Sequence, residues 1–289
     1  MAGLKLLIVD GNTRAVNDAH VSFGGGRTGE HYAAVLRALR PDADCTILRP
    51  AEAGGAELPA GTGLDAFDGV AWTGSALNVY QGGPAIEPQI ALARAVFRSG
   101  TPMFGSCWGL QVATVAAGGE VRANPRGREL GIARRIRPTA AGAGHPMFAG
   151  KEWPFDAICV HLDEVAVAAP GTTVLAWNAI SGVQAAEIVH DGGTCWGVQY
   201  HPEYDFNEIA TVILRYGSRL VEAGVFADRA TLDRFVVDLR ALEADPGRRD
   251  LAWLYGFGPD VLEPALRRAE IANWLDRVVA PRAAARGRG

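Results

Sequence analysis

The chain has 289 residues, of which 48% are hydrophobic and 21% are charged, and its formal net charge at pH 7 is −4. This composition is typical of a globular protein with a large apolar core, and the acidic balance argues against nucleic acid as a main partner. The sequence has no run of about 18 uncharged apolar residues, and its N-terminal apolar run, which ends at Asp10, is too short for a signal peptide. We therefore expect a cytoplasmic protein that does not enter a membrane.

The first 117 residues alternate strand-like apolar runs with helical patterns. Strands are expected at 4–10, 45–48, 69–72 and 102–104, and helices at 30–40, 85–99 and 108–117. This alternation predicts a parallel sheet with helices on its faces. The glycine-rich stretch 23–29 lacks the Gly-Lys-Ser/Thr ending of a phosphate-binding loop. We expect residues 11–30 to form a flexible loop, which would be a lid or a partner-binding segment.

The pattern changes after residue 118. Turn residues separate β-rich runs, which predict hairpins joined to the sheet, at 120–137, 157–160, 173–177, 183–189 and 194–200. From Asp205 onward the spacing is helical, at 206–220, 229–243 and 259–279. The predicted fold class is α/β, with a flavodoxin-like, mixed but mainly parallel central sheet flanked by helices and with a C-terminal helical extension.

Cys107 lies between a strand-like run and a helix-like run, in the segment Phe-Gly-Ser-Cys-Trp-Gly-Leu-Gln at 104–111. A nucleophile at such a turn is typical of a nucleophile elbow, in which Gly105 and Gly109 allow close backbone approach. The start of the following helix favours the thiolate. The alternative is a small buried hydrophobic residue. Buried packing is also the interpretation for Cys45, Cys159 and Cys195, and without a C-x-x-C pair zinc is not expected.

A cysteine nucleophile needs a base, and that base needs an acid to orient it. His201 closes a strand-like run and is followed by Pro202 and Glu203. Residues i and i+2 of an extended chain share a face, so the Glu203 carboxylate can reach the imidazole ring of His201. The sequence therefore predicts a catalytic triad of Cys107, His201 and Glu203.

Four segments resemble the class I glutamine amidotransferases of the triad type, in particular the amidotransferase part of GMP synthase. They are the G-x-C-x-G-x-Q motif at 105–111, a strand with a Gly-Ser turn at 68–75, H-x-D-x-V at 161–165 and H-P-E at 201–203. The γ-glutamyl hydrolases share this architecture. The resemblance covers about residues 4–222, so we expect an amidotransferase domain at 1–222 and a helical extension at 223–289 that packs on it.

The resemblance implies a role for each motif. Cys107 would attack the side-chain amide carbon of glutamine and form a γ-glutamyl thioester. Backbone N–H groups near Gly74 and at Trp108 would hold the oxyanion. His201 would protonate the departing ammonia and then activate water, and Glu203 would fix the tautomer of the histidine.

The resemblance also implies substrate contacts at Gln111, His161 and Asp163, and it implies that the segment around Arg128, Glu129, Leu130 and Gly131 reads the amino-acid end of the substrate. Asp163 is a candidate for binding the α-amino group or a structural turn residue, and His161 lines the site or is structural. We expect no metal, because His161 and Asp163 lack a third ligand, and no cofactor. Three other histidines are expected on the solvated surface and a fourth in a loop: His20, His31, His190 and, in the loop, His145.

The chain departs from the family pattern in two ways. Trp108 stands where a smaller aliphatic residue is common, and its ring is expected to alter the pocket mouth or to pack under a partner. The extension has four large apolar anchors, Trp253, Tyr255, Phe257 and Trp274. We expect the extension to pack on the core; covering a synthetase-docking surface or forming a homodimer are the alternatives. The basic tail 282–289 is expected to be frayed.

Three functions remain open at this point. The first is a glutaminase that passes ammonia to an acceptor or to a separate synthetase, because no ATP site occurs in this chain. The second is a stand-alone hydrolase of γ-glutamyl peptides or amides with the same triad. The third is a catalytically idle protein with a ligand-binding or regulatory role, and the intact triad counts against it.

Overall fold

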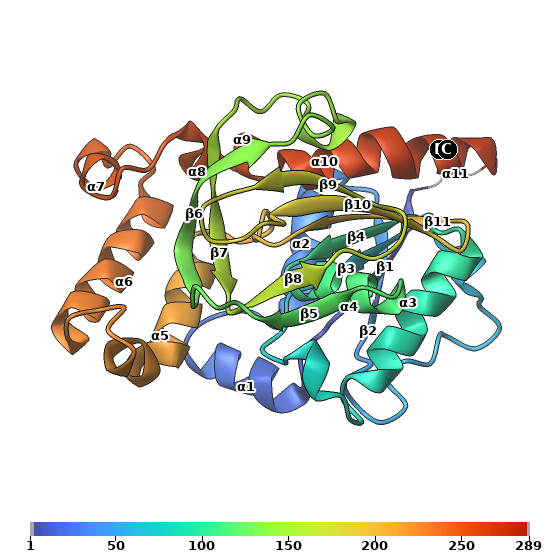
Figure 1. Ribbon diagram of the computed structural model, residues 1–289, viewed down its shortest axis with the longest axis horizontal. Coiled ribbons are helices and arrows are strands. Elements are labelled where there is room, and N and C mark those ends of the chain that lie inside the picture. The colour runs from blue at the N-terminus through green and yellow to red at the C-terminus, as the bar shows by residue number, and fades with distance from the viewer. Residues whose placement is uncertain (1–2, 288–289) are drawn as a thin grey trace.

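The computed structural model describes residues 3–287. Its centre is a nine-stranded sheet in the order β2-β1-β3-β4-β11-β10-β9-β6-β7, beside a two-stranded sheet of β5 and β8 (Figure 1). Strands β2, β1, β3, β4 and β11 are parallel, and β10, β9, β6 and β7 continue the sheet in antiparallel pairs. The predicted mixed α/β fold is confirmed. The strands are β1 (Lys5–Val9), β2 (Asp44–Leu48), β3 (Gly69–Trp72), β4 (Met103–Ser106), β5 (Glu120–Ala123), β6 (Glu129–Pro138), β7 (Phe155–His161), β8 (Asp163–Val167), β9 (Thr172–Trp177), β10 (Ala185–His190) and β11 (Gly193–Val198).

The parallel strands separate two apolar cores, because successive side chains of a strand point to opposite faces. In β1, Leu6 and Ile8 belong to the core that includes α2, whereas Leu7 and Val9 belong to the core that includes α3 and α4. Burial on both faces explains why these strands are continuous apolar runs. The helices of this part are α1 (Arg14–Ser22), α2 (Thr28–Leu39), α3 (Glu87–Ser99) and α4 (Trp108–Ala116), with short 3₁₀ turns η1 (Leu64–Ala66), η2 (Val79–Gln81) and η3 (Pro146–Phe148).

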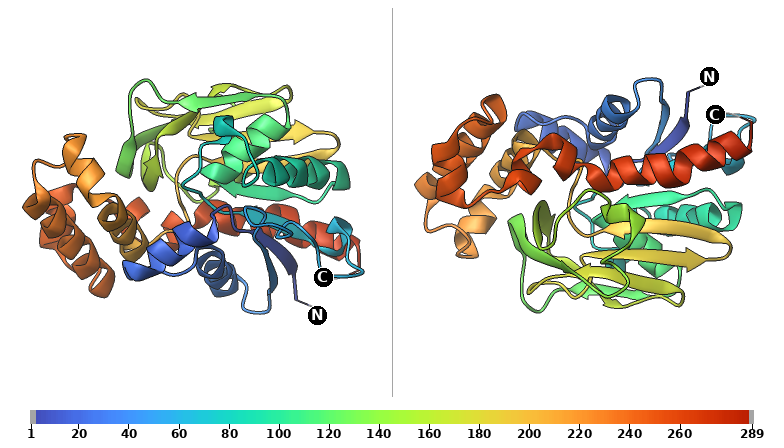
Figure 2. Two further views of the ribbon diagram at one scale, coloured as in Figure 1. Left: turned by 90° about the horizontal axis from the view of Figure 1, so that it is seen from below. Right: turned by 90° about the horizontal axis from the view of Figure 1, so that it is seen from above.

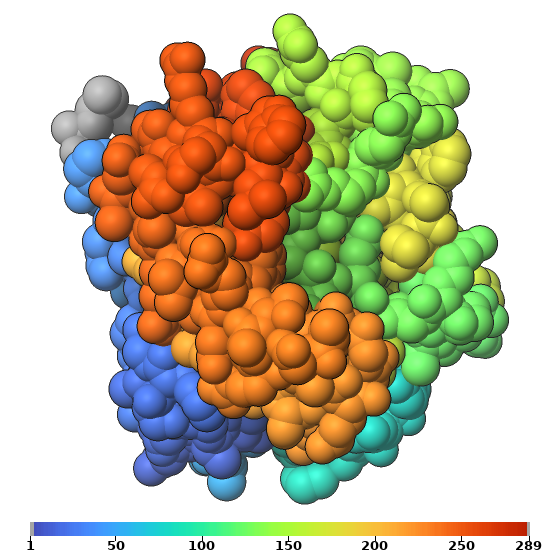
Figure 3. Space-filling view, turned by 90° about the vertical axis from the view of Figure 1, so that its left-hand side faces the viewer, coloured from blue at the N-terminus to red at the C-terminus, as the bar shows by residue number. Residues whose placement is uncertain are grey.

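The C-terminal part contacts the rest of the molecule in two places. At one end, α5 (Phe206–Glu222) and α6 (Arg229–Ala244) share a third apolar core with α7 (Arg249–Tyr255) and α8 (Pro259–Leu262), and Ile158 of β7 joins it. Helices α6 and α7 form the outer wall there (Figure 3). The following helices, α9 (Pro264–Arg267), α10 (Ala269–Trp274), the π-helical turn η4 (Leu275–Val279) and α11 (Ala280–Ala285), run across the molecule (Figure 2).

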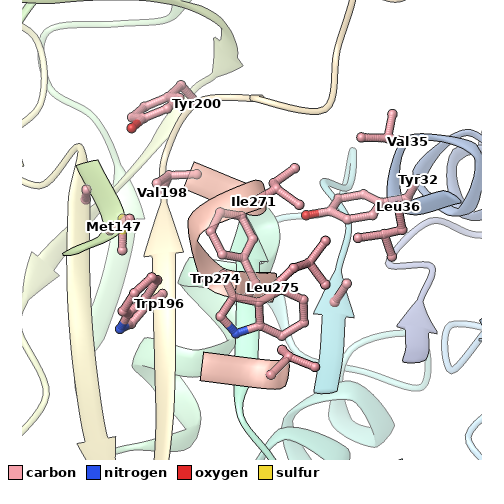
Figure 4. Close-up of a cluster of buried hydrophobic side chains, with 14 of the residues drawn as sticks. Tyr32, Val35, Leu36, Met147, Trp196, Val198, Tyr200, Ile271, Trp274 and Leu275 are labelled. Carbon is pink, nitrogen blue, oxygen red and sulfur yellow. The ribbon is translucent and has the colours of Figure 1, made fainter. Parts of the chain in front are cut away.

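The second contact is centred on Trp274. Figure 4 shows Trp274 and Leu275 between Trp196 and Val198 of β11 and the side chains of α2. A Cβ at Gly69 would lie 2.8 Å from the Trp274 ring, so β3 needs a glycine there. The division of the chain at residue 222 stays a prediction.

The structure corrects several predictions for the helices and the loops. Residues 11–30 are not one loop, because α1 occupies Arg14–Ser22, where the Thr13 side chain caps it by accepting from the N–H of Val16. The single helical pattern expected at 259–279 is divided, with Pro264 at the start of α9.

The C-terminal residues also differ from expectation. The segment expected to be a frayed tail forms α11, and Arg282 donates to the carbonyl oxygen of Phe67 at 3.0 Å; residues 288 and 289 lie outside the described residues. Trp253, expected to be an anchor, is 85% exposed, whereas Phe257 and Trp274 are buried.

Candidate active site

Cys107 occupies a strained turn between β4 and α4. Its backbone has φ 49° and ψ −96°, a conformation that residues other than glycine rarely adopt. A Cβ at Gly105 would come within 2.5 Å of the backbone of Gly109, and a Cβ at Gly109 within 2.8 Å of Trp72. The two glycines therefore allow helix α4 to start directly against the sheet, as the elbow motif predicts.

His201 and Glu203 form a buried pair immediately after β11. The Nδ1 atom of His201 lies 2.7 Å from Oε1 of Glu203, and the Tyr204 ring stacks on the imidazole at 4.0 Å. Burial disfavours the imidazolium, but the Glu203 carboxylate and the Cys107 sulfur favour it and raise the pKa of His201 from 6.5 to about 10. The carboxylate therefore favours the protonated form of this histidine.

The sulfur of Cys107 and the ring of His201 line one cavity of about 730 Å³. The Nε2 atom of His201 has no hydrogen-bond partner within residues 3–287, so its proton is available to a bound molecule. The Nε2 atom of Gln199 lies 3.5 Å from the Cys107 sulfur, and its Oε1 atom lies 3.4 Å from the Gln111 amide. We did not predict Gln199, although it lies only two residues before His201 in the sequence.

Two backbone segments predicted for an oxyanion site lie beside Cys107. Trp108 begins α4, so its N–H is one of the first four N–H groups that a helix leaves without an internal acceptor. A Cβ at Gly74 would lie 2.5 Å from Cε1 of His201, so this turn passes directly beside the imidazole ring. Asn12 holds the turn: its Oδ1 atom accepts from the N–H of Ala76 at 2.9 Å.

The Trp108 side chain does not lie where we expected it. The indole is completely buried and its Nε1–H donates to Oε1 of Gln89 at 2.7 Å. The ring packs against Gly11, where a Cβ would lie 2.5 Å from it. Because it faces the core between α3 and α4, it neither borders the cavity nor offers a surface to a partner.

The structure separates the predicted substrate contacts into two groups. Gln111, His161 and Asp163 line the cavity. Glu129, Leu130 and Gly131 are not among the lining residues.

Glu129 instead binds His161 at 2.9 Å and accepts from two buried amides, so its carboxylate is fully engaged in the protein. Arg128, which belongs to the same predicted substrate-binding segment, does line the cavity, and Tyr204 and Arg215 line it although the sequence did not single them out.

Asp163 is already hydrogen-bonded at the cavity wall. Its carboxylate accepts from Nδ2 of Asn78 at 2.7 Å and from the Tyr80 hydroxyl at 3.2 Å, and burial raises its pKa. Among the described residues, no three His, Cys, Asp or Glu side chains are grouped so that they could hold a metal ion. No helix in that part of the chain is long and apolar enough to span a membrane.

Two histidines predicted at the surface instead make contacts inside the protein, and one of them contacts Glu203. His20 is 4% exposed and binds Glu208 of α5 at 2.8 Å. His31, on α2, lies 2.9 Å from the backbone oxygen of Glu203. The partners follow the histidines by more than 170 residues, so sequence spacing gave no signal of these contacts.

The comparisons with known proteins agree with this architecture. Residues 47–218 match the family model described as glutamine amidotransferase class-I. The chain belongs to this family. The predicted family is thereby confirmed, and class-I glutamine amidotransferases are cysteine-dependent enzymes that act on the γ-glutamyl amide bond.

The similarity to one curated relative covers nearly the whole chain. The protein is 35% identical over 287 residues to a γ-glutamyl-L-1-hydroxyisopropylamide hydrolase of Pseudomonas sp, covering 98% of this chain and 96% of that one. It is 33% identical to a GMP synthase of Leifsonia xyli, covering 72% of this chain but only 40% of the relative.

The solved structures support the fold of this class-I amidotransferase. A glutamine amidotransferase from Thermotoga maritima superimposes with a TM-score of 0.65 at 15% identity, covering 96% of this chain and 99% of the other. At this level of identity the match concerns the fold alone.

Proposed function

We propose that this protein hydrolyses a γ-glutamyl amide through a thioester on Cys107. The observation that carries the proposal is the similarity to a γ-glutamyl amide hydrolase, which extends through the C-terminal helices and not only through the family domain. The buried pair of His201 and Glu203, placed at the same cavity as the sulfur, supports it.

In the first half-reaction the Cys107 thiolate attacks the γ-carbonyl carbon. The carbonyl oxygen becomes an oxyanion, which the N–H of Trp108 and the turn at Gly74 are placed to stabilise; one such donor is worth about 3 kcal/mol. Nε2–H of His201 then gives its proton to the amide nitrogen, the C–N bond breaks, and the amine leaves.

In the second half-reaction the now neutral His201 accepts a proton from water. The hydroxide attacks the thioester carbon, the C–S bond breaks, and glutamate leaves while Cys107 returns to the thiolate. Glu203 stabilises the imidazolium that forms, and the Tyr204 ring that stacks on the imidazole restricts its orientation.

The second candidate is a glutaminase that delivers ammonia to a separate synthetase. It is favoured by the 31% identity to a glutamine-hydrolyzing GMP synthase subunit of Methanococcus maripaludis, which covers 47% of this chain and 69% of the relative. The similarity to the GMP synthase of Leifsonia xyli covers only 40% of that relative, so the synthetase partner in this candidate is a proposal.

A product assay separates the two candidates. Amine, ammonia and glutamate release are measured from glutamine and from several γ-glutamyl alkylamides, with the wild type, Cys107→Ala and the control Cys45→Ala, whose thiol is half-buried on β2. We expect partner-free turnover of an alkylamide that Cys107→Ala abolishes and Cys45→Ala retains. Turnover of glutamine alone, stimulated by an ATP-dependent ligase, would instead support the synthetase candidate.

A further inference from the structure

The cavity beside Cys107 carries positive charge that the hydrolytic steps do not use. Three arginines line it: Arg128 just before β6, and Arg215 and Arg219 on α5. Asp163 is the single carboxylate among the lining residues. The lining therefore has a surplus of cations on the side that α5 forms.

The arginines lie together around one aromatic ring. The Cζ atom of Arg128 is 5.0 Å from the centroid of Tyr216, and that of Arg215 is 5.1 Å from it. Cation–π contacts of this kind hold guanidinium groups in place. Two cations that share a ring also repel one another, and an anion between or beside them removes that repulsion.

These cations have no carboxylate partner among residues 3–287. None of the ion pairs within residues 3–287 involves Arg128, Arg215 or Arg219. The Nε atom of Arg215 is buried without a hydrogen-bond partner. A buried donor of this kind costs free energy unless a ligand supplies the acceptor.

The positive charge acts on groups that border the same cavity. Burial raises the pKa of Tyr204, which stacks on His201, and the charge of Arg215 opposes that effect. Burial likewise raises the pKa of Asp163, and the charge of Arg128 opposes it. Both arginines, His201 and Asp163 are among the residues that line the cavity.

We infer that Arg128, Tyr216 and Arg215 form an anion subsite that binds a carboxylate of the γ-glutamyl substrate, an inference that rests on the proposed hydrolysis. The planar guanidinium fork matches carboxylate geometry. The carboxylate has two possible sources, the α-carboxylate of the glutamyl group or an acid group on the leaving amine. Arg219, one turn further along α5, adds to the positive electrostatic potential of this subsite.

Four amides distinguish the sources. L-γ-glutamyl and 4-aminobutanoyl groups, which differ by the α-carboxylate, are each joined to β-alanine or to n-propylamine. In Arg215→Gln we expect KM to rise about tenfold to 100-fold, with little change in kcat, only for the amides that carry the bound carboxylate. Arg98→Gln, exposed on α3, is the matched control and leaves KM unchanged.

If the rise in KM depends on either carboxylate, the result supports the subsite and identifies the source, whereas an equal change in KM for all four amides, or no change, overturns it.

Alkylation of Cys107 by iodoacetamide gives a readout that needs no turnover. Glutamine, 4-aminobutanamide and β-alanine are tested for protection of the cysteine. If the wild type hydrolyses none of the amides, the proposed function fails. Protection that Arg215→Gln weakens still supports the subsite, and unchanged protection overturns it. If Arg215→Gln does not fold, Arg215→Lys is used in its place, because lysine keeps the positive charge but lacks the planar guanidinium group.

Discussion

Glu203→Gln tests the electrostatic basis of the proposed mechanism. The substitution removes the carboxylate that lies 2.7 Å from His201. Burial lowers the pKa of this histidine, and the carboxylate no longer opposes that effect. In the wild type the pKa of His201 is about 10, against 6.5 for an ordinary histidine. Glu203 and Cys107 both raise this pKa, and each pKa unit that is lost with the carboxylate weakens the imidazolium by about 1.4 kcal/mol. We expect kcat near pH 7.5 to fall by about 10⁴-fold, as for loss of the acid in other triads.

The assay follows Cys107 alkylation and hydrolysis between pH 6 and 10. We expect the alkylation rate at neutral pH to be lower in Glu203→Gln than in the wild type, because the imidazolium of His201 loses the carboxylate that stabilises it. Alkylation and kcat profiles that coincide with those of the wild type would refute the reasoning.

The same variant makes a prediction for stability. Because the folded-state pKa of His201 is raised, protonation stabilises the fold fully below pH 6.5, and this contribution is lost as the pH rises toward about 10. The free energy of unfolding should therefore differ more between wild type and Glu203→Gln at pH 6.5 than at pH 9.5, as urea denaturation can measure. An equal difference at both pH values would contradict the raised pKa.

Three further variants test the packing around the site. Gly74→Ala places a methyl group 2.5 Å from Cε1 of His201, so steady-state kinetics should show kcat reduced by about 100-fold; an unchanged kcat would show that the turn can move. Glu270 forms a buried ion pair with Lys151, whose Nζ atom lies 2.8 Å from its carboxylate. Glu270→Ala leaves the Lys151 charge buried without this partner and should lower the free energy of unfolding by about 3–5 kcal/mol in urea titrations. Trp274→Ala should cost about 3–5 kcal/mol, whereas the exposed control Trp253→Ala should cost less than about 0.5 kcal/mol; equal costs would contradict the packing of α10.

The nucleophile elbow was predictable because its requirements are local. Gly105, Cys107 and Gly109 lie within five residues, and the steric reason for the glycines holds wherever a strand turns sharply into a helix. The direction of the Trp108 ring was not predictable in this way. It depends on Gly11 and Gln89, which come from distant elements and together make a site for an indole.

The histidines show that the sequence also fails to indicate which ionisable side chains are buried. A histidine in a polar sequence suggests solvent, yet His20 is buried because α5 brings Glu208 to it. One local signal was available in this region: Thr13 is a good helix cap, and it begins the unpredicted helix α1. Propensity therefore indicated the helix boundary, but only the tertiary arrangement determines which of its side chains are buried.

The position of α5 explains how residues outside the family domain affect the cavity. On one side α5 contributes Val212 and Arg215 to the lining, and on the other it packs against α6. Glu243 of α6 accepts from the N–H of Phe206 in the first turn of α5 at 3.0 Å. Because α5 follows the segment that bears His201, α6 supports the helix that carries Arg215 of the proposed anion subsite. A substrate cavity shaped by the C-terminal helices is therefore consistent with similarity to a hydrolase over the whole chain, and not over the amidotransferase region alone.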